Sequence, residues 1–147
     1  MKLLKKITNG ILLIVIGIMH IQFALSADCF GDQFKEFAKT CFFKVHRGLE
    51  DLPFMPGHTN METFAAFWFF YFGVLIIPLG LLVHFYEKKN TILPHTFTIS
   101  YLLVVLLGSY MIPSSGMTYI MLPHAIYMLV TNYIKYRKSQ QTVHQIQ

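Results

Sequence analysis

The feature that most constrains this chain is an uninterrupted apolar stretch at residues 63–86, with the sequence TFAAFWFFYFGVLIIPLGLLVHFY. It contains no Lys, Arg, Asp or Glu, so an α-helix made from it has no charged face to turn toward water. As a helix, its roughly 24 residues rise about 36 Å, slightly more than the roughly 30 Å hydrocarbon core of a bilayer. The stretch therefore predicts a tilted membrane-spanning helix.

The composition agrees with lipid as the surrounding solvent. Apolar residues make up 54% of the 147 residues, charged residues 13%, and the mean hydropathy is +0.50. Soluble domains carry roughly 25% charged residues. The net charge of +5 is not gathered into a basic stripe with interleaved aromatic residues, so we expect no nucleic-acid partner and take the lipid bilayer as the main one.

Three further apolar runs are long enough to cross a membrane or nearly so. The predicted spans are residues 7–26, 63–86, 94–112 and 117–134, followed by a polar tail at 135–147. The fold class we predict is all-α, a single integral membrane domain built as a four-helix antiparallel bundle. Its outer loop, residues 28–62, is expected to hold an amphipathic helix at 31–47 on the membrane surface.

Capping and helix-breaking residues set the expected helix ends. Asn60 is predicted to cap the span that follows it, and Pro94 to sit in the first turn of the next. The segment PSSG at 113–116 should stop that span and force the fourth to return beside it.

The first apolar run has a second interpretation. Its basic start, apolar middle and small residues at 24–27 are typical of a cleaved secretory signal. The run is longer than the roughly 7–15 apolar residues usual in such signals, which favours retention.

Small residues recur every seven positions in the first two spans. Gly10, Gly17 and Ala24 form one set, and Ala66, Gly73 and Gly80 form the other. Helices in lipid associate through such small-residue seams, because they let the backbones approach closely. We therefore predict that these two spans form a tight antiparallel hairpin, with Gly17 opposite Gly73.

The positive charges predict orientation. Eight basic residues flank the spans at the two termini and in the turn at 87–93, whereas the outer loop has four basic residues and six acidic ones. The positive-inside rule then places both termini in the cytoplasm, with a bacterial cytoplasmic membrane as the expected location. Cys29 and Cys41 fall on the outer side, where a disulfide between them and two free thiols are both compatible with the sequence.

Two histidines, His20 and His124, are expected well inside the bilayer, at similar depth. In one interpretation each makes an interhelical hydrogen bond that holds the bundle together. The partners expected for these bonds are Tyr71, Tyr110, Ser109 and Thr131.

In a second interpretation, the two imidazoles share an outer-leaflet pocket that binds a quinone, a lipid or another small amphiphile. Its candidate residues are His20, His124, Trp68, Tyr71 and Tyr127, with Phe67, Phe69 and Phe70 as further apolar wall. In a third interpretation, the two histidines, which lie on different helices, ligate a haem iron.

No catalytic motif is evident in the sequence. It has no Ser-His-Asp order, paired intramembrane carboxylates, glycine-rich phosphate loop or metal-ligand spacing, so we expect no metal and no enzymatic activity. The leading hypothesis is a membrane protein that binds a small hydrophobic ligand or a partner membrane protein. The alternatives are a quinone- or haem-binding subunit of a membrane oxidoreductase, and a structural or assembly subunit.

A set of short motifs follows in order along the spans: GIMH at 17–20, AFWF at 66–69, Gly73, PLG at 78–80, Pro94, PSSG at 113–116 and Pro123. This order resembles a family of small bacterial four-helix membrane proteins of unknown function. The resemblance implies four spans in a bacterial cytoplasmic membrane and carries over no catalytic residue. The loop that contains the two cysteines is not part of the pattern.

Overall fold

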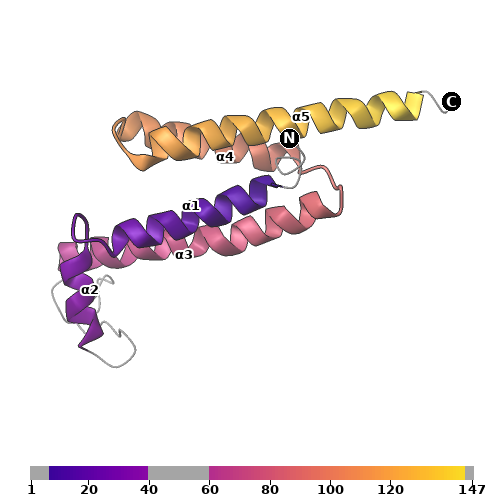
Figure 1. Cartoon of the computed structure of the whole chain (residues 1–147). Coiled ribbons are helices and arrows are strands. Elements are labelled where there is room, and N and C mark those ends of the chain that lie inside the picture. The colour runs from indigo at the N-terminus through magenta and orange to yellow at the C-terminus, as the bar shows by residue number, and fades with distance from the viewer. Residues whose placement is uncertain (1–6, 40–59, 145–147) are drawn as a thin grey trace, which may run out of the picture. The chain divides into compact units, whose positions relative to one another are not determined.

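The computed structural model describes residues 7–39 and 60–144, and all regular structure in these ranges is helical (Figure 1). The helices are α1 (Asn9–Ala24), α2 (Gly31–Ala38), α3 (Met61–Lys88), α4 (His95–Met111), the short π-helix η3 (Met117–Met121) and α5 (Leu122–His144). The all-α class predicted from the sequence is confirmed.

The chain divides into two compact units. Unit 1 comprises Met1–Ile16 and Leu79–Gln147, and unit 2 comprises Gly17–Pro78. Because the boundaries fall inside α1 and α3, each of these helices contributes residues to both units.

Helix α3 is, in the ranges the structure describes, the one helix long and apolar enough to cross a membrane unaided. It has 28 residues, and 28% of its most apolar window is buried. Helices α1 and α4 are apolar but have only 16 and 17 residues. They end one or two residues inside the predicted spans, because residues 25–30 and 112–116 form turns at their carboxyl ends.

Both ends of α3 are closed by specific hydrogen bonds. At its start, the Asn60 side-chain Oδ1 accepts hydrogen bonds from the backbone N–H groups of Glu62 at 3.0 Å and Thr63 at 3.1 Å, as predicted for a cap. At its end, Asn90 takes a left-handed conformation with φ 55°. The N–H of Thr91 then bonds the Tyr86 carbonyl at 3.1 Å, which is a Schellman motif.

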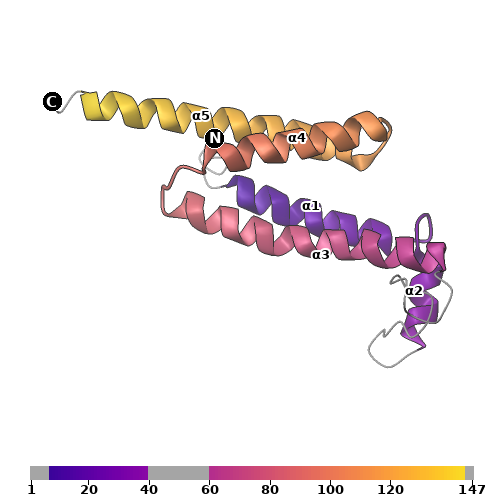
Figure 2. The same ribbon diagram turned by 180° about the vertical axis from the view of Figure 1, so that it is seen from behind.

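Helices α4 and α5 run side by side within unit 1 (Figures 1 and 2). Pro94 lies at the N-cap of α4 rather than in its first turn, with the extended dihedrals φ −56° and ψ 131°. The helix ends at Met111, just before Pro113, as predicted.

The fourth apolar run begins as a π-helix, Met117–Met121, before the α-helix starts at Leu122. Pro123 has no N–H to donate to the preceding turn, and π-type turns accommodate a local break in the α-helical hydrogen-bond pattern. Helix α5 extends to His144, ten residues beyond the predicted span end at 134, because the polar tail contains neither Gly nor Pro.

The small residues lie at close backbone contacts in both units. In unit 2, a Cβ added to Gly17 would lie 2.9 Å from the Gly73 carbonyl oxygen, and Ala24 and Ala66 are fully buried. In unit 1, a Cβ added to Gly80 would lie 2.8 Å from the Gly10 carbonyl oxygen. Any larger residue at these glycines must displace backbone atoms of the opposite helix.

The predicted surface helix at 31–47 is described only in part. Helix α2 covers Gly31–Ala38, with Lys39 as its C-cap, and residues 40–47 lie outside the described ranges. Phe37 is buried on one side of the helix, whereas Lys35 and Lys39 are exposed on another. This sidedness is typical of a helix that lies on a surface.

Candidate functional site

His20 makes a packing contact within unit 2. Its Nε2 lies 2.8 Å from the backbone carbonyl oxygen of Phe69 on α3, and the two rings are 4.3 Å apart. Since a carbonyl can only accept, Nε2 carries the proton and donates it. The bond joins α1 to α3, as the packing interpretation expects, but its partner is a backbone carbonyl rather than a Tyr, Ser or Thr side chain.

Three aromatic residues close to Phe69 in the sequence, Phe67, Trp68 and Tyr71, pack with one another. Phe67 and Tyr71 stack at 5.5 Å with an interplanar angle of 11°, and Trp68 packs edge-on against both. Trp68 and Tyr71 are exposed, so they do not enclose the His20 imidazole. The aromatic neighbours of His20 are Phe69 and Phe72.

His124 lies in the first turn of α5 in unit 1 and is 7% exposed. Its Nδ1 is 3.2 Å from the Tyr101 hydroxyl on α4, and its Nε2 is buried without a hydrogen-bond partner in the described part of the chain. Tyr127, expected on the same inward face, is half-exposed, so helix α5 turns it away from His124. Each histidine has its contacts within its own unit, and the shared pocket stays a prediction.

A buried carboxylate, Glu87, organises the other polar contacts of unit 1. Its side chain is 4% exposed and accepts hydrogen bonds from the Asn9 side-chain amide at 2.6 Å and the Gly10 backbone N–H at 3.3 Å. Lys135 of α5 forms an ion pair with it at 3.3 Å. An anion here also faces the positive end of the α1 dipole. The carboxylate therefore ties together α1, α3 and α5.

Asn9, which bonds this carboxylate, also lies near His124. Its amide nitrogen also lies 3.3 Å from the Thr131 hydroxyl, whereas its Oδ1 is buried without a partner among the described residues. The His124 ring is close enough to the Asn9 backbone and to Glu87 to interact electrostatically with both, although no hydrogen bond of ordinary geometry joins it to them. Two unpaired polar atoms, Asn9 Oδ1 and His124 Nε2, thus lie in one buried region.

A second buried amide, Asn132, closes the turn between α3 and α4. Its Oδ1 accepts from the Leu93 N–H and its Nδ2 donates to the Leu93 carbonyl, both at 2.9 Å. The ring of His95 lies at 3.5 Å from the same amide nitrogen. These contacts fix the start of α4 against α5.

Sequence reasoning missed the buried roles of Glu87, Asn9, Tyr101 and Asn132. One signal was present for Glu87, because it continues the seven-residue repeat of Ala66, Gly73 and Gly80. The turn predicted at 87–93 includes Glu87, whereas in the structure this residue lies inside α3.

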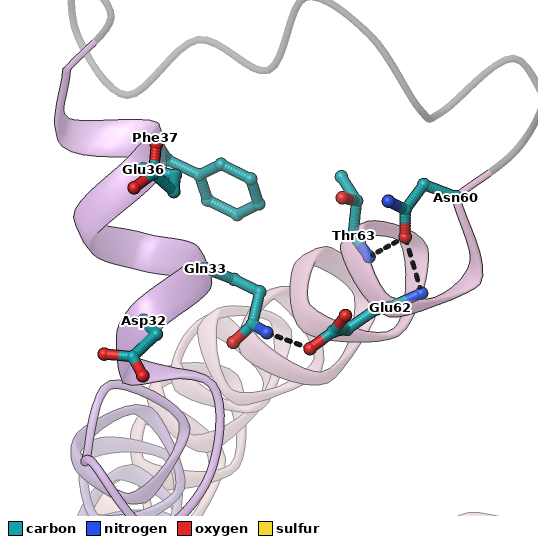
Figure 3. Close-up of a pocket in the computed structure, with 7 residues that line it drawn as sticks. All are labelled: Asp32, Gln33, Glu36, Phe37, Asn60, Glu62 and Thr63. Atoms are coloured by element: carbon teal, nitrogen blue, oxygen red, sulfur yellow. Dashed lines mark hydrogen bonds between the residues drawn. The ribbon is translucent and has the colours of Figure 1, made fainter.

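A polar cavity of about 290 Å³ lies in unit 2 between α2 and the start of α3 (Figure 3). It is lined by Asp32, Gln33, Glu36, Phe37, Asn60, Glu62 and Thr63. The Gln33 amide donates to Glu62, and the Phe37 ring points across the cavity toward Asn60 and Thr63 (Figure 3).

The acidic residues of this cavity are already paired. Asp32 and Glu36 form 2.6 Å ion pairs with Lys35 and Lys39. The hydrogen bond and charge of Lys35 hold the pKa of Asp32 below its usual value, and those of Asp32 raise the pKa of Lys35. No group of three His, Cys, Asp or Glu in the described ranges is arranged to hold a metal ion.

Cys29 lies in the turn between α1 and α2 and is half-buried. Its burial raises the pKa of the thiol, an effect that outweighs a hydrogen bond with the Phe30 backbone. Cys41 lies outside the described residues, so the Cys29–Cys41 disulfide stays a prediction.

Taken together, the described helices define an all-α protein whose polar side chains are used mainly to join helices. This chain belongs to a family of unknown function (DUF6463), whose pattern matches residues 5–135. The prediction of membership in an uncharacterised family is confirmed. No curated protein and no solved structure matches the sequence.

Proposed function

We propose that this chain is a multi-pass membrane protein that binds a small, largely hydrophobic ligand at His124. The observation that carries the ligand proposal is the Nε2 of His124, a buried polar atom with no partner among the described residues. A polar atom buried without a hydrogen bond costs about 1–3 kcal/mol of stability. We therefore expect a bound molecule to supply the hydrogen bond that His124 Nε2 lacks.

The membrane placement is supported by the apolar residues that the described helices leave uncovered. On α4, Val104 is 66% exposed and Leu107 61% exposed. Large exposed apolar residues also occur along α1, α3 and α5, for example Val15, Leu82 and Val130. Large apolar side chains exposed in this number are unfavourable in water and are expected against lipid.

The short helices are compatible with spanning. Helix α1 rises only about 24 Å over its 16 residues, and flanking apolar residues and local thinning of the bilayer compensate for such differences. We place four spans in a bacterial cytoplasmic membrane with both termini in the cytoplasm, following the distribution of Lys and Arg. Reporters of sidedness fused at Gln147 and inserted near Gly57 test this, since the proposal requires them to report from opposite compartments.

The chemistry at His124 sets the class of ligand. With Nδ1 held by Tyr101, Nε2 is free to donate to, or accept from, one carbonyl or hydroxyl group. Met121, Ala125 and Met128 lie within about one turn of His124 along the chain and are buried, so the surroundings expected for a hydrophobic ligand body are apolar. A quinone or another amphiphile with a single polar head has this composition.

The ligand test compares His124→Ala with His20→Ala. We expect mass spectrometry of the wild-type protein to detect a co-purified small molecule that His124→Ala loses, and a short-chain ubiquinone probe to stabilise the wild type but not His124→Ala. His20 bonds only a backbone carbonyl, so His20→Ala should bind the probe and lose stability instead. Equal binding of the probe by the wild type and His124→Ala would refute the proposal.

The second candidate function is a structural or assembly subunit, favoured by the uncovered apolar faces. If cells that carry the double variant His20→Ala and His124→Ala have the same phenotype as wild-type cells, this candidate is supported. The third, a haem-binding subunit, is disfavoured by the hydrogen bond that occupies His20 Nε2. A Soret band in the purified protein would restore it.

A further inference from the structure

We propose that the carboxyl end of α3 binds the headgroup of an anionic phospholipid in a groove lined by Leu82, Phe85, Tyr86, Lys89 and Thr91. The groove lies entirely within unit 1 and has a volume of about 420 Å³. This inference uses the membrane placement proposed above and is independent of the ligand at His124.

The Schellman motif at the end of α3 forms the groove. The left-handed conformation of Asn90 reverses the chain, and the bond from the Thr91 N–H to the Tyr86 carbonyl brings Thr91 back over the last turn. A second bond, from the Asn90 N–H to the Glu87 carbonyl, fixes the same turn. The hydroxyl-bearing side chains of Tyr86 and Thr91 consequently line one concave surface together with Lys89.

The charge of Lys89 is not compensated by a neighbouring acid. The nearest carboxylate in the sequence, Glu87, is buried and already bonded to Asn9 and Lys135. No ion pair of Lys89 occurs in the described part of the chain. An exposed ammonium group flanked by two hydroxyl-bearing side chains matches the charge and the acceptor oxygens of a phosphate.

The rest of the groove favours a lipid over a free phosphate ion. Phe85 and Leu82 lie about one and two turns before Lys89 and are more than half exposed. They continue the groove from its cationic end toward the apolar part of α3, in the direction that an acyl chain takes from a headgroup at the interface. Juxtamembrane lysines on the cytoplasmic side are attracted to anionic lipid.

One effect opposes an anion at this position. A helix carboxyl end bears a partial negative charge, which falls off within the last turn. The Schellman bonds engage two of the terminal carbonyl groups, and Lys88 and Lys89 add two full positive charges at the same end. The lysine charges therefore dominate the local field.

The experiment uses the full-length protein in detergent with added dioleoyl phosphatidylglycerol, followed by native mass spectrometry and thermal unfolding. We expect stabilisation by phosphatidylglycerol and none by phosphatidylcholine or inorganic phosphate at the same concentration. Lys89→Gln should weaken binding about fivefold, the contribution typical of one lysine at an anionic surface. Leu82→Asn should weaken it as well, through the acyl-chain end of the groove.

Lys88→Gln is the matched control. It removes the same charge from the neighbouring residue, and the Lys88 side chain does not line the groove. Equal losses in Lys88→Gln and Lys89→Gln would overturn the site in favour of general attraction to a charged surface. Equal binding of phosphatidylcholine, or saturable binding of inorganic phosphate, would also overturn it. His124→Ala should keep phosphatidylglycerol binding, and the sidedness reporters separately test the membrane placement.

Discussion

The carboxylate of Glu87 accepts a 2.6 Å hydrogen bond from the side-chain amide of Asn9, 78 positions earlier in the sequence. Both side chains are almost completely buried. The bond is a polar counterpart to the close contact between Gly10, the residue after Asn9, and Gly80, two helical turns before Glu87. Three helices meet at this carboxylate, so its loss should affect the whole unit.

Replacing Glu87 with Ala should destabilise the protein by about 1–3 kcal/mol or more, the typical cost of leaving buried hydrogen-bond donors without an acceptor. The Asn9 amide and the Gly10 N–H would lose their acceptor, and Lys135 its counterion. Thermal or SDS-induced unfolding in detergent measures the effect. Lys135→Gln provides a contrast, because it keeps the carboxylate and its hydrogen bonds to Asn9 and Gly10, and the Lys135 side chain is 50% exposed, so it should cost less than Glu87→Ala. Equal losses in both variants would contradict the central role of the carboxylate.

The glycine seam gives a second prediction. Gly17→Leu or Gly73→Leu should loosen the α1–α3 contact in unit 2, because a Cβ alone at either position meets atoms at 2.9 Å. Overpacking of this kind costs about 1–3 kcal/mol or more. The measurement is the unfolding temperature in detergent.

Gly116→Ala is the control for the seam, since nothing lies within 4 Å of a Cβ added at Gly116. Its unfolding temperature should match that of the wild type. If Gly17→Leu and Gly73→Leu are as stable as Gly116→Ala, the close approach of the two backbones is wrong.

The helices and the glycine contacts could be predicted from sequence because they depend on local features: the length of the apolar runs, prolines at helix ends and a seven-residue spacing of small residues. The Asn9–Glu87 and Asn132–Leu93 bonds could not. Each joins residues far apart in the chain through one side chain, and a single Asn near a predicted interface carries no periodic signal. The sequence predicts His124 as a candidate inward-facing histidine, but it does not predict the partner Tyr101, because four-helix topology alone does not set the rotation of each helix.

Asn132 offers a third prediction. Asn132→Leu should cost about 1–3 kcal/mol or more, because it leaves the buried N–H and carbonyl of Leu93 without partners. Asn132→Asp is the matched variant: it keeps an acceptor for the Leu93 N–H and loses the donor to the carbonyl. Its stability should fall between those of the wild type and Asn132→Leu at neutral pH. An Asn132→Leu protein as stable as the wild type would show that the turn is held by other contacts.

Cys29 gives a prediction about pH. Burial raises the pKa of its thiol, so at any given pH a smaller fraction is thiolate, the form that reacts with alkylating reagents. In a Cys41→Ser variant, where Cys29 is the one remaining cysteine, alkylation by iodoacetamide should therefore be slower than that of free cysteine at pH 8. The rate should continue to rise above the pH at which free cysteine levels off. In unfolded protein, the same thiol should follow the free-cysteine curve, because unfolding removes the burial that shifts its pKa. A native rate profile identical to that of free cysteine would mean that the turn between α1 and α2 leaves the sulfur open to water.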